Sequence, residues 1–425
     1  MKTAPLAVVL EGSTPREKLR QGWSPQCLTS PAPDSAWGVL KTTAIQAGAF
    51  LPHENKELPA HLAPRPALEV RANDLLLTCA GPRSRCGVPA LVRSTRPRLM
   101  ISGKMYRFTA DPRHMDPRFL ELYLLSPGAQ RQIDQMKTGI SDSGLNLTKD
   151  RFLALPVPIA PIAEQRRIVD ILEDHLSRLD AAESAMESGR RKAGVLESTI
   201  LDHYIWAQEN PLAPVEDLLS APLRNGHSAR ATSGPGIRTL TLTAVTRRAF
   251  TDEFTKITVA APDRVRDLWL EPGDILVQRS NTPELVGSTA IYNGPREWAI
   301  FPDLMIRLRA DSSRVSSEYL CLAVQSERGH RVLRSKAKGL AGSMPKIDQE
   351  AIGSLRVPVP DATTQAEVVS RSAEASLALT RLDQASRNAS ARGASLRRAL
   401  LVAAFTGRLT GRSSDFDHAE ELTAP

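Results

Sequence analysis

The stretch LPVPIAPIAEQRRIV at residues 155–169 decides the fold of this chain, and it returns in a looser form, VPVPDATTQAEVV, at residues 357–369. A Pro-x-Pro run holds the backbone extended and prevents a helix from starting early. After each run the chain continues for about 40 residues with neither proline nor strand signal. The sequence therefore predicts two extended hinges, each followed by a long helix.

Outward from the first hinge, the chain is built twice. Residues 74–143 laid over 274–343 are identical at 15 of 70 positions without a gap, against roughly 4 or 5 expected from composition alone. The offset of 200 slips to 202 at the hinges and returns at Gln165 and Gln365. A repeat this long indicates a duplicated domain, and a duplicated domain suggests a ligand with two similar halves.

Each copy has a globular front for which we predict an α+β fold, with two similar domains related by a pseudo-two-fold repeat. Short buried strands are expected at 74–77 and 274–277, the second entered through a turn at Gly273, and further strands at 99–108 and 299–308. Helical spacing covers 119–136 and 319–337, and a glycine, Gly139 or Gly339, is expected to close each helix.

The long helices carry apolar residues at seven-residue steps, which is a coiled-coil pattern. We expect the two helices to pack against each other through Leu172, Leu179, Met186, Leu196, Ile200, Leu382, Leu396 and Leu400. Alanines, Gly189 and Gly393 on these faces would allow close approach. Each helix would be roughly 60 Å long. An alternative is that each is the core helix of a larger domain, which the many charges on its other faces disfavour.

These patterns divide the chain into a first domain at 1–155, a central spacer helix at 156–210, a second domain at 211–357, and a C-terminal spacer helix with its tail at 358–425. The 55 Lys plus Arg against 47 Asp plus Glu give a formal charge of +8, which makes a polyanion a reasonable partner. Four cysteines without metal-ligand spacing disfavour a zinc site. No apolar run approaches membrane-spanning length and no signal peptide is evident, so we expect a cytoplasmic protein.

Motifs for catalysis are not found in the sequence. It has no methyltransferase tetrad, no Walker A loop and no nucleophile elbow. Asp34 with Glu54 and Lys56 fits a loose nuclease pattern, in which two carboxylates would hold a metal ion. The second copy keeps only the lysine, as Lys256. A stand-alone nuclease therefore remains an alternative, and mutation of Glu54 and Lys56 would then abolish cleavage.

A family resemblance follows from these residues. The run GDILVQRSN at 273–281 with LVG at 285–287 resembles the signature stretch of the DNA-specificity subunits of type I restriction-modification enzymes. The first copy carries a degraded version at 73–87, with Asn73 and Cys79 in place of Gly273 and Arg279. The hinge at 155–169 and the segment 398–410 resemble the entrance and the end of that family's spacer helices.

The resemblance implies two target-recognition domains, each reading half of a split duplex DNA sequence, and two antiparallel spacer helices that set the unread gap. It implies a non-catalytic chain that binds no cofactor itself. Its implied partners are double-stranded DNA, two adenine-N6 methyltransferase subunits that use S-adenosylmethionine, and ATP-dependent restriction and translocation subunits that use ATP and Mg. The leading alternative of another class is a coiled-coil scaffold with two protein-binding heads.

The DNA-contacting residues are expected in loops that differ between the copies while their flanks agree. Base edges are read by Arg, Lys, Asn, Gln and Ser, and phosphates by Lys, Arg and backbone amides. The candidates in the first copy are Arg83, Arg85, Lys137, Ser141 and Ser143, and those in the second are Arg279, Ser280, Asn281, Lys336, Lys338, Ser343 and Lys346. Alternatively, Arg279 and Asn281 only cap their turn.

Overall fold

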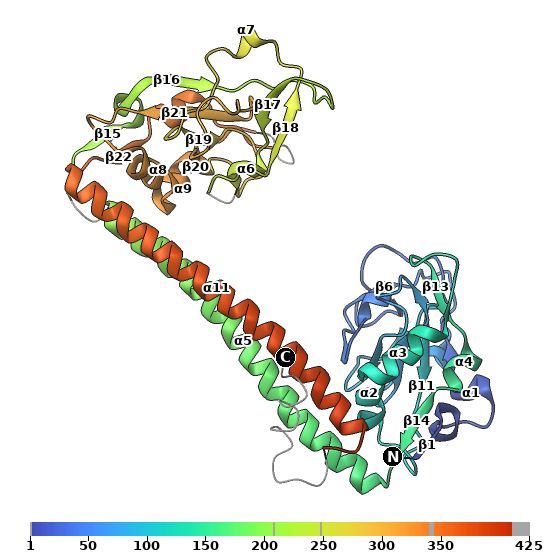
Figure 1. The fold of residues 1–425 in the computed structure, drawn as a ribbon. Coiled ribbons are helices and arrows are strands. Elements are labelled where there is room, and N and C mark those ends of the chain that lie inside the picture. Colours follow the sequence, from blue (N-terminus) through green and yellow to red (C-terminus); the bar gives the residue numbers. More distant parts are fainter. Residues whose placement is uncertain (1, 207–208, 247–248, 340–343, 410–425) are drawn as a thin grey trace. The chain divides into compact units, whose positions relative to one another are not determined.

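The computed structural model describes residues 2–206, 209–246, 249–339 and 344–409. The chain divides into two compact units. Unit 1 combines the residues up to Ala185 with those from Arg387 onward, and unit 2 runs from Met186 to Ser386. Each unit contains one globular region and a part of each of two long helices, α5 (Ile162–Trp206) and α11 (Ala362–Phe405) (Figure 1). The predicted α+β class is confirmed.

The globular region of unit 1 is built on a four-stranded antiparallel sheet in the order β2-β11-β7-β9. Its strands are β1 (Lys2–Pro5), β2 (Arg20–Gln21), β3 (Gly38–Leu40), β4 (Ile45–Gln46), β5 (Ala49–Phe50), β6 (Asn55–Glu57), β7 (Leu75–Thr78), β8 (Ala80–Gly81), β9 (Pro89–Leu91), β10 (Leu99–Met100), β11 (Met105–Phe108), β12 (Lys137–Thr138), β13 (Leu145–Leu147) and β14 (Pro156–Ile159). Its helices are α1 (Pro15–Lys18), α2 (Pro117–Leu125), α3 (Pro127–Met136) and α4 (Lys149–Leu153).

Unit 2 repeats this plan with the sheet β16-β21-β19-β20. Its strands are β15 (Leu212–Pro214), β16 (Leu219–Asn225), β17 (Ile237–Leu240), β18 (Thr255–Thr258), β19 (Ile275–Gln278), β20 (Thr289–Ile291), β21 (Met305–Ala310) and β22 (Arg356–Pro358), and its helices are α6 (Thr243–Thr246), α7 (Pro262–Val265), α8 (Ser317–Gln325), α9 (Glu327–Ser335) and α10 (Gln349–Gly353). Arg107 pairs with Leu76 in one sheet, and Arg307 pairs with Leu276 in the other. The repeat therefore extends to the strand register.

The turns before β7 and β19 need a left-handed backbone. Gly273 has φ +93°, and Asn73 takes the same place in unit 1 with φ +69°. Glycine adopts this conformation freely, and asparagine is one of the few other residues that tolerate it. The substitution of Asn73 for glycine in the first copy therefore preserves the turn.

Two expected strands are shorter than the sequence pattern predicted. The segment 99–108 forms β10 and then β11, with residues 101–104 turning between them, and β10 pairs in parallel with β3 in a different sheet. In unit 2 the strand begins at Met305 instead of Ala299. Apolar residues alone cannot reveal that a chain passes from one sheet to another.

The predicted helices at 119–136 and 319–337 are each two helices, broken at Ser126 and Ser326. Each serine hydroxyl caps the next helix, and Ser126 is followed by Pro127, which supplies no amide donor. The expected closure by glycine was also wrong. α3 ends at Met136 and is followed by β12, so Gly139 lies beyond that strand, and α9 ends at Ser335.

The hinges are strands that close each globular region. β14 pairs antiparallel with β1, and β22 pairs antiparallel with β15. The start of each globular region is thus tied to its end immediately before the long helix. The three boundaries between the four predicted segments stay predictions.

The long helices run side by side and antiparallel within each unit (Figure 1). In unit 1, Arg397 of α11 pairs with Asp180 of α5. In unit 2, Arg190 lies 3.9 Å from Asp383, and Arg371 donates to the Tyr204 hydroxyl at 2.7 Å. The expected packing of the two helices against each other is therefore present.

The helix ends belong to the globular cores. In unit 1, Ile168 and Leu172 of α5 share one cluster with Leu400 of α11 and with the α2 residues. Phe405 packs edge-on against Phe119 and Tyr123, with ring centroids 5.2 Å apart in both pairs. In unit 2, Ile205 and Val368 enter the core in the same way.

The seven-residue spacing identified only part of the packed face. Leu172 and Leu400 are fully buried, and Leu179, Met186 and Leu396 are half-buried. The prediction was wrong for Leu196, Ile200 and Leu382, which are 58%, 39% and 41% exposed. A straight helix drifts by about 20° per heptad, so a strict seven-residue row leaves the contact face. Gly189 and Gly393 also do not mark close approach, because a Cβ at either would meet nothing within 4 Å.

Within the described part of the chain, no helix is both long enough and apolar enough to cross a membrane.

Candidate nucleic-acid interface

Arg83 and Lys137 form one ion network in unit 1. The Arg83 guanidinium pairs with Asp134 at 2.8 Å and with Asp142 at 3.0 Å. Lys137 Nζ lies 2.9 Å from Asp134 and also donates to the Arg83 carbonyl. The hydrogen bond from Lys137 is the largest cause that lowers the pKa of Asp134. This network ties the loop after β8 to the turn after β12, and about half of the Arg83 side chain stays exposed.

Arg85 points inward. Its guanidinium donates to the Thr42 and Ile45 carbonyls at 2.6 and 2.8 Å and to Gln46 Oε1 at 3.0 Å. These contacts occupy the planar donor face that would otherwise read a guanine. In this structure Arg85 therefore positions its loop against residues 42–46.

Ser141 and Ser143 lie at the exposed tip of the turn between β12 and β13. Both serines are exposed, and their hydroxyl oxygens lie 2.9 Å apart. Ile140 beside them is fully exposed, as one of the large apolar side chains that the fold leaves uncovered. Of the first-copy candidates, these two serines are the most open to a ligand.

The second-copy loop after β19 is folded inward. Asn281 Nδ2 donates to Gln278 Oε1 at 2.7 Å, and its Oδ1 accepts from the Thr282 amide at 2.8 Å. Ser280 is fully buried, and neither its hydroxyl nor Arg279 Nε has a hydrogen-bond partner within the described part of the chain. Asn281 thus caps the turn, as the alternative interpretation held, while Arg279 and Ser280 keep unmet polar groups.

The lysines of the second copy are exposed at the end of α9 and beyond it. Lys336 Nζ donates to the Ser354 hydroxyl at 2.7 Å, and Lys338 pairs with Asp348 at 3.2 Å. Lys346 pairs through its backbone with Lys338. Ser343 lies outside the described residues. The DNA-contact assignments in both copies stay predictions.

Unit 1 also contains a basic pocket that the sequence did not predict. Lys41, Lys56 and Lys104 line an open pocket of about 400 Å³ together with the hydroxyl residues Ser24, Thr42 and Ser102. These residues come from separate segments, so no local motif contains them. The one available signal was the lysine shared by the two copies, Lys56 and Lys256.

The carboxylates of the nuclease pattern are held apart in separate ion pairs. Asp34 pairs with Arg96 at 3.4 Å, whereas Glu54 pairs with Lys41 at 3.4 Å and accepts a hydrogen bond from Thr43. That bond is the main cause of a lowered Glu54 pKa. Among the residues described, no three His, Cys, Asp or Glu side chains are arranged to hold a metal ion.

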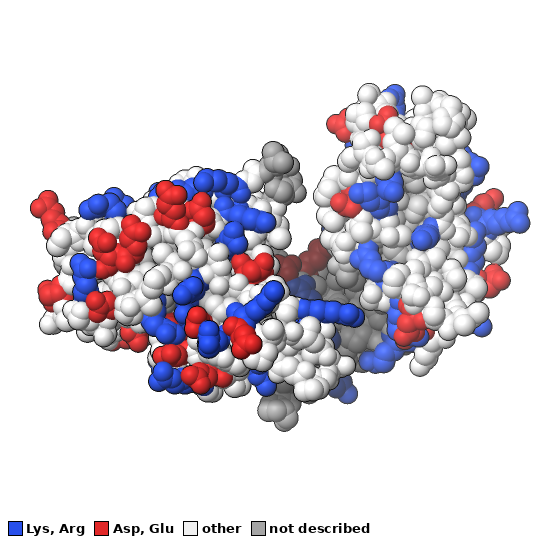
Figure 2. Space-filling model, turned by 90° about the horizontal axis from the view of Figure 1, so that it is seen from above, with Lys and Arg blue, Asp and Glu red and all other residues white. Residues whose placement is uncertain are grey.

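Charge alone does not mark a binding face. Figure 2 shows Lys and Arg side chains interspersed with Asp and Glu on the face in view. On this face the positive side chains do not gather into one basic patch. Specific clusters, and not the net charge, must carry any DNA contact.

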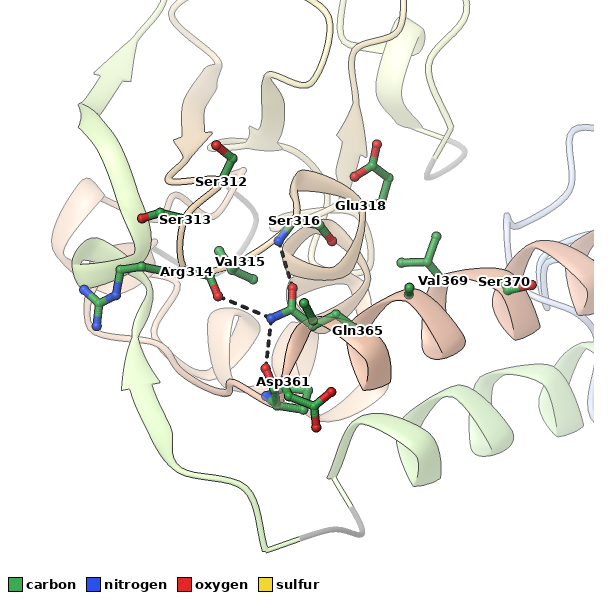
Figure 3. A pocket seen from close by; sticks show the side chains of 13 residues that line it. Ser312, Ser313, Arg314, Val315, Ser316, Glu318, Asp361, Gln365, Val369 and Ser370 are labelled. Carbon is green, nitrogen blue, oxygen red and sulfur yellow. Dashed lines mark hydrogen bonds between the residues drawn. The ribbon is translucent and has the colours of Figure 1, made fainter.

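A second pocket lies where α11 leaves the globular region of unit 2 (Figure 3). It has a volume of about 610 Å³, and Gln365 stands at its centre with residues 312–318 on one side. Gln365 Oε1 accepts from the Ser316 amide at 2.8 Å, and Nε2 donates to the Pro360 carbonyl at 2.9 Å and the Arg314 carbonyl at 3.3 Å. Gln165 makes the same three contacts in unit 1, to Asp116, Ala160 and His114.

Comparison with known proteins gives a consistent result for sequence and fold. A family model described as "Type I restriction modification DNA specificity domain" matches residues 91–186. The EcoEI type I specificity subunit of Escherichia coli is 36% identical over 171 residues, which are 40% of this chain and 29% of that protein. The StySPI specificity subunit of Salmonella potsdam is 23% identical over 401 residues, 88% of this chain and 82% of that one.

In sequence and in fold this chain is therefore similar to the type I restriction-modification DNA-specificity subunits.

Solved structures agree in fold. A chain from a study of complex assembly and conformational transition of the type I restriction-modification system has a TM-score of 0.71 at 17% identity, covering 96% of this chain and 98% of that one. The HsdS subunit from Thermoanaerobacter tengcongensis has a TM-score of 0.53 at 18% identity, covering 96% and 97%. The matched segment 91–186 runs from the end of β9, inside the first globular region, into α5 and includes Gln165.

Proposed function

We propose that this chain gives a type I restriction-modification complex its DNA sequence specificity. Each globular region reads one half of a split duplex target, and the long helices set the gap between the halves. The observation that carries the proposal is the duplicated framework with different loops. The sheets of the two units share register at offset 200, while the loops after β7 and β19 differ in sequence and in contacts.

The proposal also assigns the partners. The chain would join two adenine-N6 methyltransferase subunits that use S-adenosylmethionine, and ATP-dependent restriction and translocation subunits that use ATP and Mg. Recognition would come from this chain and catalysis from the partners. Because the substrate is chromosomal and invading duplex DNA, the complex would act in the cytoplasm. The similarity to type I specificity subunits and the length of the two helices support this assignment.

The decisive experiment is long-read sequencing for N6-methyladenine in cells that express this chain with its partner subunits. We expect one split motif with a fixed gap and one modified adenine in each half. Deletion of this chain should remove that methylation while the methyltransferase subunits remain present. Expression of all subunits without any split methylated motif would contradict the proposed function.

A further inference from the structure

The basic pocket of unit 1 is assembled by strand pairing. β3 pairs antiparallel with β6, which sets Val39 opposite Lys56, and β10 pairs parallel with β3, which sets Met100 beside Val39. Lys41 follows β3 directly, and Lys104 lies in the turn between β10 and β11. The three lysines therefore face one open pocket of about 400 Å³ whose shape depends on the strand framework.

Within the part of the chain that the structure describes, only one of the three lysines that line the pocket is paired with a carboxylate. Lys41 is paired with Glu54 at 3.4 Å. Among the described residues, neither Lys56 nor Lys104 lies within ion-pair distance of a carboxylate, and both are exposed. Burial raises the pKa of the Cys27 thiol, and the nearby Lys56 charge opposes that rise. The thiol thus stays neutral at pH 7, and two ammonium groups remain available to an anion.

The pocket also contains hydroxyl groups. Ser24, Thr42 and Ser102 line it beside the lysines. Ser102 is only 9% exposed. Within the described chain, its hydroxyl has no hydrogen-bond partner. A buried hydroxyl without a partner costs free energy, so an oxygen-rich ligand close to it would be favoured.

Unit 2 supplies an internal comparison, because its framework is the same. Thr239 pairs with Lys256 as Val39 pairs with Lys56, and Thr239 lies beside Ile300 as Val39 lies beside Met100. The other pocket positions differ, since Thr241, Pro302 and Leu304 stand where unit 1 has Lys41, Ser102 and Lys104. A carboxylate is added at Asp303, which accepts a hydrogen bond from Ser228. The fold therefore does not require the three lysines.

We propose that the pocket lined by Lys41, Lys56 and Lys104 binds one phosphodiester group of duplex DNA, and that unit 2 has no equivalent site. This proposal rests on the proposed function. A phosphodiester carries one negative charge and several acceptor oxygens, which ammonium and hydroxyl groups satisfy together. Contacts of this kind fix the position of a protein on the duplex and carry no sequence information.

The pocket is linked by hydrogen bonds to the loop after β8, which carries candidate base-contacting residues. The Lys104 carbonyl accepts a hydrogen bond from the Cys79 amide at 2.8 Å, immediately before the loop that carries Arg83. Arg85 in that loop holds the Thr42 carbonyl, and Thr42 lines the pocket. A phosphate in the pocket is thus fixed relative to the loop, whose exposed residues can then face the adjacent base edges.

The first test measures the salt dependence of duplex binding by the full chain assembled with its methyltransferase subunits. The variants are Lys56→Gln, Lys104→Gln and the double variant. If both lysines hold one phosphate, the double variant should lower the slope of log K against log salt by about 1 in total, rather than about 2. The split methylated motif should not change. A loss near 2, or none, would overturn the proposal.

Two controls keep this test specific. Lys256→Gln removes the matching lysine of unit 2, where Thr241 and Leu304 replace the other two lysines, and should leave the slope unchanged. A slope loss equal to that of Lys56→Gln would overturn the proposal, since a lone lysine would then suffice. The double Lys→Arg variant at 56 and 104 keeps the charge and should retain the wild-type slope. Thermal unfolding midpoints of all variants should match that of the wild type.

The second test uses Cys27 as a probe inside the pocket, because the other three cysteines are buried. Saturating target duplex should slow alkylation of Cys27 in the wild-type assembly, and the double Lys→Gln variant should lose that protection. Inorganic phosphate alone, at matched ionic strength, should not protect. Protection by inorganic phosphate without protection by duplex would assign the pocket to a free anion and overturn the DNA assignment.

The outcomes separate this proposal from the proposed function. If the wild-type assembly shows no preferred duplex sequence and no split methylation, the proposed function fails. If it binds and methylates a split target while the double variant keeps the wild-type slope and Cys27 protection, only the phosphate pocket fails.

Discussion

Gln165 and Gln365 are the residues where the repeat regains its offset, and the structure gives the physical reason. Each side chain uses its amide to connect the first turn of a long helix to the loop before α2 or α8 and to the hinge carbonyl. One glutamine meets three backbone groups at fixed positions. A shift of the helix by one residue would leave buried backbone groups unpaired, so the offset is recovered here.

We predict that Gln165→Leu destabilises the protein more than Gln365→Leu. Loss of the amide leaves the Asp116 amide buried and unpaired, at a cost of about 1–3 kcal/mol. The pocket of about 610 Å³ beside Gln365 can admit water to the Ser316 amide, which should reduce the cost there. Chemical denaturation of both variants provides the measurement. Equal losses would show that solvent access at the hinge does not matter.

The repeated aspartates before β7 and β19 differ in their partners. Asp274 is held by Arg309 at 2.7 and 3.0 Å, with Arg307 at 4.0 Å. In unit 1, Thr109 stands at the position of Arg309 and donates a hydrogen bond to Asp74. Arg107 lies 3.8 Å from Asp74. Burial is the largest cause that raises the pKa of Asp74 above its ordinary 3.8. The same residue is therefore neutralised well in one copy and poorly in the other.

We predict that Asp274→Asn lowers the free energy of unfolding by about 2 kcal/mol. Breaking a fully buried ion pair costs roughly 3–5 kcal/mol, and the loss here is smaller because the Arg309 side chain is 31% exposed. Asp74→Asn should cost clearly less at pH 7. With a raised folded pKa, the stabilisation from Asp74 is fully present below pH 3.8 and is lost as pH rises through the folded pKa. Denaturation midpoints of both variants across pH 3–7 check the order and the sign. A larger loss for Asp74→Asn would contradict this account.

At the scale of the element, the long helices are only partly specified by their apolar pattern. Along α11, Ser372 and Ser386 are half-buried, while Leu382 is exposed. Small and polar residues at the contact keep the helices together through modest burial and a few cross-helix polar pairs. The stability of these helices therefore depends strongly on intrinsic helix propensity.

Three glycines in the helices are unnecessary for packing, and alanine should replace them with a gain. A Cβ at Gly189, Gly194 or Gly393 would meet nothing within 4 Å. Each replacement should stabilise its helix by about 1 kcal/mol. Thermal melting followed by circular dichroism gives the readout. As a control, Gly22→Ala should destabilise, because its Cβ would lie 2.1 Å from the Ile101 carbonyl. A lower melting temperature for Gly393→Ala would mean that the two helices approach each other closely at this position.

At the scale of the whole molecule, the antiparallel pairing makes the two long helices a matched pair. Asp180 faces Arg397 and Arg190 faces Asp383, so positions near 185 on α5 correspond to positions near 390 on α11. α5 has 45 residues, which is about 68 Å of helix. A change in one helix length must be matched in the other if these contacts are to persist.

Inserting seven residues after Ala185 and seven after Ala389 should lengthen the unread gap and leave both half-sequences unchanged. Seven residues add about 10 Å, or at most about three base pairs at 3.4 Å each. Sequencing of N6-methyladenine in cells that express the variant reads out the gap. An insertion in α5 alone should break the matched pairs and reduce methylation. If the doubly lengthened variant kept the original gap, the helices would not set it.

The sequence predicted the framework well because a repeat reports on backbone constraints. Shared residues such as Asp74 and Asp274 mark the turn and sheet that both copies need, and their positions are confirmed by the common register. The loops were harder. Arg85 and Asn281 have the chemistry of base-reading residues, yet they bond to nearby backbone and side-chain groups. Residue type could not distinguish a side chain that contacts bases from one that stabilises its own loop, because both roles use the same hydrogen-bonding groups.

The sequence by itself determined the duplication, the two long helices and the family resemblance, because spacing and identity at a fixed offset are properties of the chain alone. Only the tertiary structure decided which helix face is packed, why the offset returns at Gln165 and Gln365, and how Lys41, Lys56 and Lys104 come together. Strand pairing places Val39 beside Lys56, 17 residues later, and beside Met100, 61 residues later, with neighbouring strands about 5 Å apart. Local patterns contain no information on such neighbours, so a site built from three strands and turns appears only in the folded protein.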